Sequence, residues 1–209
     1  MPPHKHQVLL TAAIEREGEA QHRLLAGDLD AARAEFAAAA ELYRQSWESA
    51  HARAFGRLVG MLKASVLAGE GSEEAEYVRA ALGERDPESP TASYAQALAA
   101  LILGEDQDAR LWAARMSPVG SAGGGAGGGG GTDAFARTGE AVSAIASDDG
   151  ERYAVALAAI VLDFEQRSEH LTGVAIADTA LMLEALAARR GMRAAVESPV
   201  LPVGLVPPS

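Results

Sequence analysis

Apolar residues recur at every third or fourth position along most of the chain, the spacing that places them on one face of an α-helix. The clearest early stripe follows Gly27 and Asp28 and consists of Ala32, Phe36, Ala39, Tyr43 and Trp47. Further stripes begin near residues 55, 72, 94, 109, 135, 153 and 174. No segment shows a convincing strand pattern. The sequence therefore predicts an all-α fold of about nine helices in irregular antiparallel hairpins, with no sheet.

Several helix ends are marked by residues that break helices. Two prolines in the segment GERDPESP (83–90) stop the helix that precedes them. The last helix is predicted to run from about residue 174 to residue 190 and to end at Gly191, because glycine readily adopts the left-handed conformation that closes many helices. The tail SPVLPVGLVPPS holds too many prolines for a helix, and we expect it to lie extended across the surface.

A glycine-rich run, SAGGGAGGGGG, interrupts the helical pattern at 121–131. It contains the letters G-x-G-x-x-G, but a dinucleotide-binding loop needs a strand before it, and the preceding segment has the pattern of a helix. Ordering so many glycines is costly, which favours a flexible linker. The predicted organisation is a helical-hairpin part at 1–120, the linker at 121–131, a helical part at 132–191 and a proline-rich tail at 192–209.

Composition narrows the classes of function. The chain has no cysteine and carries a net charge of −11, from 18 basic and 29 acidic side chains. This charge disfavours binding to nucleic acid or anionic membranes and favours a basic partner. The first twenty residues lack the form of a signal peptide, and no apolar stretch is long enough for a membrane span, so we expect a cytoplasmic protein. Arginine outnumbers lysine 16 to 2, as is typical of GC-rich bacterial genomes.

The sequence lacks the residue patterns that are typical of catalytic and metal-binding sites. The histidines do not form a pair at the i, i+4 spacing that would place two metal ligands on one helix face. The acidic residues at 105–108 lack the alternating oxygen ligands of a calcium loop, and no nucleophile elbow or phosphate-binding loop occurs. We expect neither an enzyme nor a protein with a metal or cofactor.

A short repeat links a glycine and an acid at three turns. Leu25–Asp28, Leu67–Glu70 and Leu103–Asp106 each end an apolar helix, and their glycines are spaced near the period of helix-turn-helix repeats. The segment from Gly27 to Ala39 resembles the second helix of a tetratricopeptide repeat, although Glu19 stands where the first helix of such a repeat is usually apolar. The resemblance implies a degenerate, right-handed tetratricopeptide-like array; the alternative is an ordinary helical domain whose turns use glycine and acid.

The C-terminal third resembles a second family. The stretch YAVALAAIVLDF (153–164), followed by VAIADTALMLEALAARRG (174–191), is similar to the end of the all-helical bacterial immunity proteins of polymorphic toxin systems, the immunity protein 49 type. The glycine-rich run and the proline-rich tail depart from that pattern. The resemblance implies a protein that neutralises a cognate toxin by stoichiometric binding, without catalysis.

These observations predict a non-catalytic protein-binding module, with a basic protein as its partner. The predicted contacts are the acidic residues at two helix starts, namely Glu73, Glu74, Glu76, Glu105, Asp106 and Asp108. The alternative is a small-ligand-binding or regulatory helical domain, with a pocket lined by Trp112, Tyr94 or Tyr153. Self-association and the packing of the two helical parts on each other are left open by the sequence.

Overall fold

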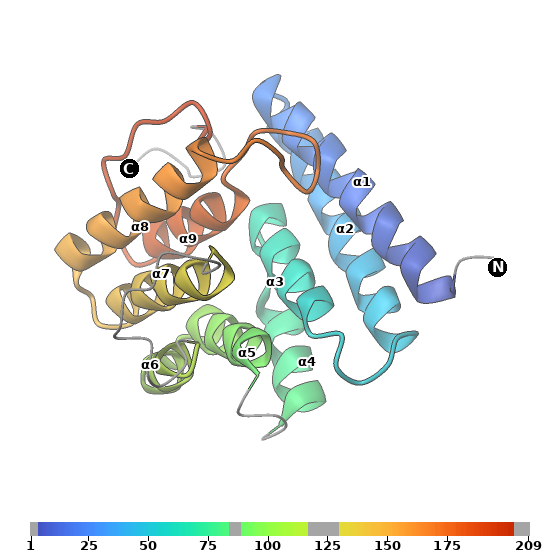
Figure 1. The fold of residues 1–209 in the computed structure, drawn as a ribbon, viewed down its shortest axis with the longest axis horizontal. Coiled ribbons are helices and arrows are strands. Elements are labelled where there is room, and N and C mark those ends of the chain that lie inside the picture. The colour runs from blue at the N-terminus through green and yellow to red at the C-terminus, as the bar shows by residue number, and fades with distance from the viewer. Residues whose placement is uncertain (1–3, 84–88, 117–129, 203–209) are drawn as a thin grey trace.

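The computed structural model describes residues 4–83, 89–116 and 130–202 (Figure 1). Within these residues it contains nine helices and no strand, so the all-α prediction is confirmed. The first five helices are α1 (Lys5–Leu25), α2 (Leu29–Glu48), α3 (Gly56–Ala68), α4 (Ser72–Leu82) and α5 (Pro90–Leu103). The other four are α6 (Asp106–Ala114), α7 (Gly130–Ile145), α8 (Gly150–Glu165) and α9 (Asp178–Ala188).

Helices that follow one another in the chain mostly pack as neighbours. The α1–α2 hairpin lies on one side of the molecule, α6 to α9 lie on the other, and α3 stands between them (Figure 1). The array also closes on itself, because α9 contacts α3 and α7 contacts α5. The tetratricopeptide-like order of the hairpins stays a prediction.

The repeated glycine-and-acid turns end helices, as the sequence indicates. Gly69 and Gly104 cap α3 and α5 with φ angles of 103° and 78°, a left-handed conformation that side chains with a Cβ rarely adopt. At the first turn, the Asp28 carboxylate accepts a hydrogen bond from the Ala31 N–H and so caps α2.

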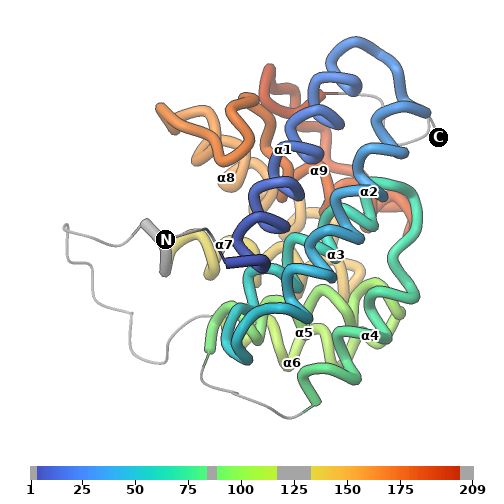
Figure 2. The backbone as a smooth tube through the Cα atoms, turned by 90° about the vertical axis from the view of Figure 1, so that its right-hand side faces the viewer, coloured from blue at the N-terminus to red at the C-terminus, as the bar shows by residue number. Residues whose placement is uncertain are grey.

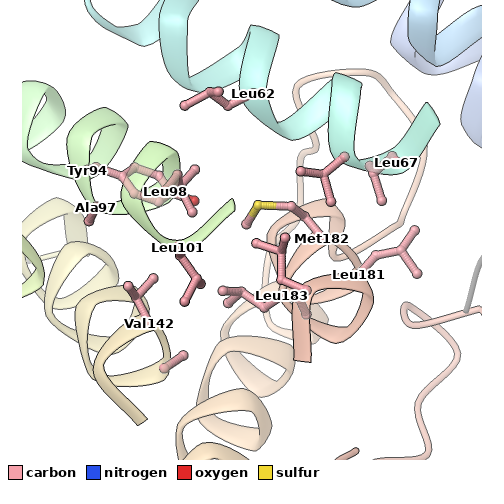
Figure 3. Close-up of a cluster of buried hydrophobic side chains, with 14 of the residues drawn as sticks. Leu62, Leu67, Tyr94, Ala97, Leu98, Leu101, Val142, Leu181, Met182 and Leu183 are labelled. Atoms are coloured by element: carbon pink, nitrogen blue, oxygen red, sulfur yellow. The ribbon is translucent and has the colours of Figure 1, made fainter. Parts of the chain in front are cut away.

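One hydrophobic core includes residues from both sides of the glycine-rich run. Leu62 of α3, Leu98 of α5, Val142 of α7 and Met182 of α9 meet in the same buried cluster (Figure 3). The two predicted helical parts therefore pack together. Most of the predicted linker lies outside the described residues, and its last two glycines, at 130 and 131, already belong to α7.

The last helix begins later than predicted, at Asp178 and not near residue 174. Residues 166–177, which we call the strap, follow α8 and are not helical. They reach across to α1 (Figures 1 and 2). The Thr172 hydroxyl donates to Gln21 Oε1 at 2.5 Å, and a Cβ on Gly18 of α1 would lie 3.1 Å from the Thr172 carbonyl oxygen. Side-chain and backbone contacts to α1 thus take the place of helical structure in this segment.

The chain after α9 is described up to residue 202 and is not helical there, as predicted. Gly191 adopts the left-handed conformation expected at a helix end, with φ 72°. The Val200 carbonyl accepts a hydrogen bond from the Ala177 N–H at 2.7 Å, which fixes this segment against the start of α9. The rest of the predicted tail lies outside the described residues. Among the described helices, none combines the length and the apolar content that a membrane crossing requires.

Gly60 allows α3 to approach the Tyr43 ring of α2. A Cβ at Gly60 would lie 2.8 Å from both Cε1 and Cζ of that buried ring. We expect Gly60→Ala to lower the free energy of unfolding by about 1–3 kcal/mol, because the ring must shift within a packed core. Urea denaturation measures the change.

Gly56→Ala is the matched control, because Gly56 belongs to the same helix and a Cβ there would meet no neighbouring atom within 4 Å. We expect this variant to be neutral or up to about 1 kcal/mol more stable, since alanine favours the helix. Equal denaturation midpoints for the two alanine variants would contradict the assigned role of Gly60.

Candidate functional site

A cavity of about 270 Å³ lies beneath the strap, enclosed by α1, α3, α5, α7, α8 and α9. We call it the inner cavity. Its apolar wall consists of Phe135, Ile160, Phe164, Leu171 and Ile176. Its ionisable and hydroxyl side chains include Lys63, Tyr94, Arg137, Asp163, Arg167 and Asp178. An apolar pocket with a few convergent polar groups is the usual form of a small-ligand site.

An ionic cluster lies at the inner end of the cavity and consists of Glu17, Tyr43, Lys63 and Asp178. The Lys63 ammonium donates to Asp178 and lies 3.4 Å from Glu17 Oε1. Glu17 is fully buried, and its other carboxylate oxygen accepts a hydrogen bond from the Tyr43 hydroxyl at 2.7 Å. The cluster joins α1, α2, α3 and α9 through charged groups that are almost wholly removed from water.

Burial and charge pull the pKa values of this cluster in opposite directions. Burial raises the pKa of Glu17 above its usual value, although the Lys63 ammonium opposes the shift. Burial alone would lower the pKa of Lys63, but the Asp178 and Glu17 carboxylates outweigh it and hold that pKa well above its usual value. Lys63 therefore stays protonated at neutral pH, as a charged hydrogen-bond donor and not as a nucleophile.

Tyr94 enters the inner cavity from α5 and is 8 % exposed. Its hydroxyl has no well-aligned hydrogen-bond partner among the described residues, although Thr179 lies close enough to influence it. Burial raises the pKa of Tyr94 to about 12. Tyr94 therefore stays protonated at neutral pH.

At the outer end of the cavity, two guanidinium groups share one carboxylate. Arg137 donates to Asp163 Oδ1 at 2.7 Å, and Arg167 donates to Asp163 Oδ2 at 3.1 and 2.5 Å. The Arg167 guanidinium also lies over the Phe164 ring, 3.8 Å from its centroid. This end of the cavity therefore combines a local excess of positive charge with aromatic surface.

A second cavity, of about 440 Å³, is lined in part by Leu171 of the strap; we call it the outer groove. Leu10 and Ile14 of α1 line it together with Phe55 and Val59, and most of its exposed lining is apolar. Lys63 and Leu171 line both this groove and the inner cavity, so the two adjoin each other under the strap.

Three of the six acidic residues predicted to contact a partner are engaged within the chain. Arg79 of α4 pairs with Glu105 and with Asp108, the latter at 3.1 Å. Arg190, after α9, donates to Asp106 at 2.5 Å. These carboxylates tie the start of α6 to α4 and to the end of α9, which gives them a structural role.

The three acidic residues at the start of α4 are less constrained. Glu73 and Glu76 are exposed, and Glu73 is 4.0 Å from the nearest nitrogen of Arg44. Glu74 is half-buried, and its Oε2 atom has no hydrogen-bond partner among the described residues. Glu73 and Glu76 are thus exposed and little engaged within the chain, and the role of all six acidic residues in partner binding stays a prediction.

Of the aromatic residues that the sequence suggested for a pocket, only Tyr94 lines the inner cavity. Tyr153 is fully buried and donates to Glu184 at 2.5 Å, while Trp112 stacks with Arg115 away from the cavity. The ionic cluster escaped sequence reasoning entirely. One signal pointed to it, because Lys63 is one of only two lysines in the chain and lies within a mostly apolar helix.

Comparison with known proteins does not assign a family, since no family model matches the chain and no curated protein or solved structure is significantly similar to it.

Proposed function

We propose that this protein is a non-catalytic protein-binding module, of the kind that neutralises a toxin by stoichiometric binding, and that its partner occupies the outer groove. The observation that carries the proposal is the apolar lining of this groove beside Leu171. That side chain is 72 % exposed at the strap, although leucine is ordinarily buried. An apolar anchor from a partner would cover Leu171 together with Leu10, Ile14 and Phe55.

The charge of the whole chain, and not that of the groove lining, favours a basic partner, because the charged side chains that line the groove are Arg53, Arg57 and Lys63. The net charge of −11 accelerates the encounter with a positively charged protein, and salt weakens this attraction. Glu73 and Glu76, exposed at the start of α4, contribute to this field. They lie outside the groove lining, so their expected effect is on the rate of association more than on the lifetime of the complex.

The state of Lys63 supports a function without catalysis. This amine lines both cavities, and two carboxylates keep it protonated. A lysine that acts as nucleophile or general base needs the opposite shift, toward a lower pKa. The Lys63 ammonium therefore acts as a fixed positive charge between the two cavities.

Two exposed apolar residues allow a matched test. Leu171 lies in the groove lining and is 72 % exposed, whereas Val155 is 74 % exposed on α8 and lines neither cavity beneath the strap. We expect Leu171→Gln to weaken partner binding at least tenfold, because it removes an apolar contact at the centre of the interface. Val155→Gln should bind as the unchanged protein does.

The measurement is a tagged pull-down from cells that produce the protein, at low and high salt, followed by the affinity of each variant for the captured protein. A basic protein bound in a one-to-one ratio, and lost only with Leu171→Gln, is the expected result. Capture that is equal for the two glutamine variants would refute the outer groove as the binding surface.

A further inference from the structure

We propose that the inner cavity binds a small organic anion, with its acid group at Arg137 and Arg167 and a single aromatic ring against the apolar wall. This second binding activity goes beyond the proposed partner binding, because its ligand has the opposite charge to a basic protein. The inference rests on the charges that line the cavity and on the shape of its apolar wall.

The charges that line the cavity are opposite in sign to those of the whole chain. Three cationic side chains line it, those of Lys63, Arg137 and Arg167, against the two carboxylates of Asp163 and Asp178. At the inner end Lys63 is compensated by Asp178 and by Glu17 behind it. The excess positive charge is therefore located at the outer end.

Geometry at the outer end suits an acid group. Two guanidiniums carry ten N–H donors in total, and the two oxygens of Asp163 receive three of them. A carboxylate or phosphate from a ligand can accept from the same guanidinium pair, and such charge-assisted hydrogen bonds are among the strongest in proteins. The side chains of Arg137 and Asp163 are about 30 % exposed, so a ligand can reach them from solvent.

The apolar wall sets the size and shape of the ligand. Phe135 meets Tyr94 edge to face, with ring centroids 6.1 Å apart and planes at 83°, and Ile160, Phe164 and Ile176 complete the wall. A volume of about 270 Å³ falls just below the ~300–1,000 Å³ of drug-sized pockets. A compound with one ring and a short acidic side chain therefore fits, and a dinucleotide does not.

The Tyr94 hydroxyl adds no contact to the ligand, because its oxygen is buried from solvent and Thr179 lies close enough to influence it. Tyr94 contributes its ring to the apolar wall. The ligand class is thus an aromatic acid.

Two related probes test these contacts by calorimetric titration of the full chain. The probes are phenylacetate and phenylacetamide, which lacks the charge. We expect the acid to bind at least tenfold more tightly than its amide. An amide that binds as well as the acid, or no binding of either probe at millimolar concentrations, overturns the proposal.

Variants assign the contacts to residues. The double variant Arg137→Gln and Arg167→Gln should lower the affinity for phenylacetate at least tenfold and leave the amide unchanged. Arg152→Gln is the matched control, because Arg152 is an α8 arginine that pairs with Glu140 outside the cavity. Equal losses in this control and in the double variant would show that the cavity arginines do not bind the acid group.

Discussion

Replacing Lys63 with methionine is expected to destabilise the protein by about 3–5 kcal/mol, because it leaves two buried carboxylates without a counter-charge. Glu17 is fully buried and Asp178 is nearly so, and both lie against the Lys63 ammonium. Methionine fills a similar volume, so the loss would report the missing charge and not a cavity. Urea denaturation at neutral pH measures it.

The triple variant Lys63→Met, Glu17→Gln and Asp178→Asn is the control, since it removes the buried charges together. We expect it to recover most of the lost stability, because a buried ion pair is rarely worth more than neutral groups of the same shape. A triple variant as unstable as the single one would show that the ionic cluster stabilises the fold through shape and not through charge.

The Lys63→Met variant should also be less destabilised at acid pH. Burial already raises the pKa of Glu17 above 4.5 in the unchanged protein, and loss of the ammonium can only raise it further. A carboxyl whose folded pKa is raised contributes stability that is complete below its unfolded pKa and is lost as the pH rises through the folded value. The stability gap between variant and parent should therefore narrow toward about pH 4.

A second large effect is expected in alkali, where the protein should lose stability steeply above about pH 10. Burial raises the pKa of Tyr94 from 10.0 to about 12, so the folded state keeps a proton that the unfolded chain gives up. The corresponding stability is complete below pH 10 and is lost as the pH rises to 12. Two pKa units correspond to roughly 3 kcal/mol from this residue alone.

Tyr43 and Tyr153 add to this loss, because burial also raises their pKa values, with neighbouring carboxylates acting in the same direction. Denaturation between about pH 9 and pH 11.5, with phenolate absorbance followed in parallel, tests the expectation. Tyr94→Phe should flatten the pH dependence, whereas Tyr77→Phe, at a half-buried position on α4, should change it less. Phenolate absorbance that rises well before unfolding would contradict the expected protection.

The sequence predicted those parts of the fold that depend on local patterns. Apolar spacing located the helices, and the glycines at 69, 104 and 191 marked turns because only a residue without a Cβ adopts their conformation readily. The start of α9 was placed too early. Val174, Ile176 and Ala177 continue the apolar pattern of that helix, but contacts of the strap with α1 override local preference there.

The candidate site depends on contacts between residues far apart in the chain, which local patterns do not contain. Lys63 and Asp178 are 115 residues apart, and Arg79 reaches acidic residues 26 and 29 positions away. For this reason the sequence did not reveal that Glu105 and Asp108 pair with Arg79 at the surface of the molecule. Only the unusual lysine in α3 gave an indication of the ionic cluster.

The ionic cluster also bears on how the protein is made. Glu17 and Lys63 leave the ribosome before Asp178, which follows Lys63 by 115 residues. At a synthesis rate of ~5–20 residues per second, this interval lasts roughly 6–23 s. During that time the nascent N-terminal helices lack α9, so the surface of α3 that later contacts it remains uncovered. Until α9 has been synthesised, the growing chain therefore exposes this surface of α3 to other molecules.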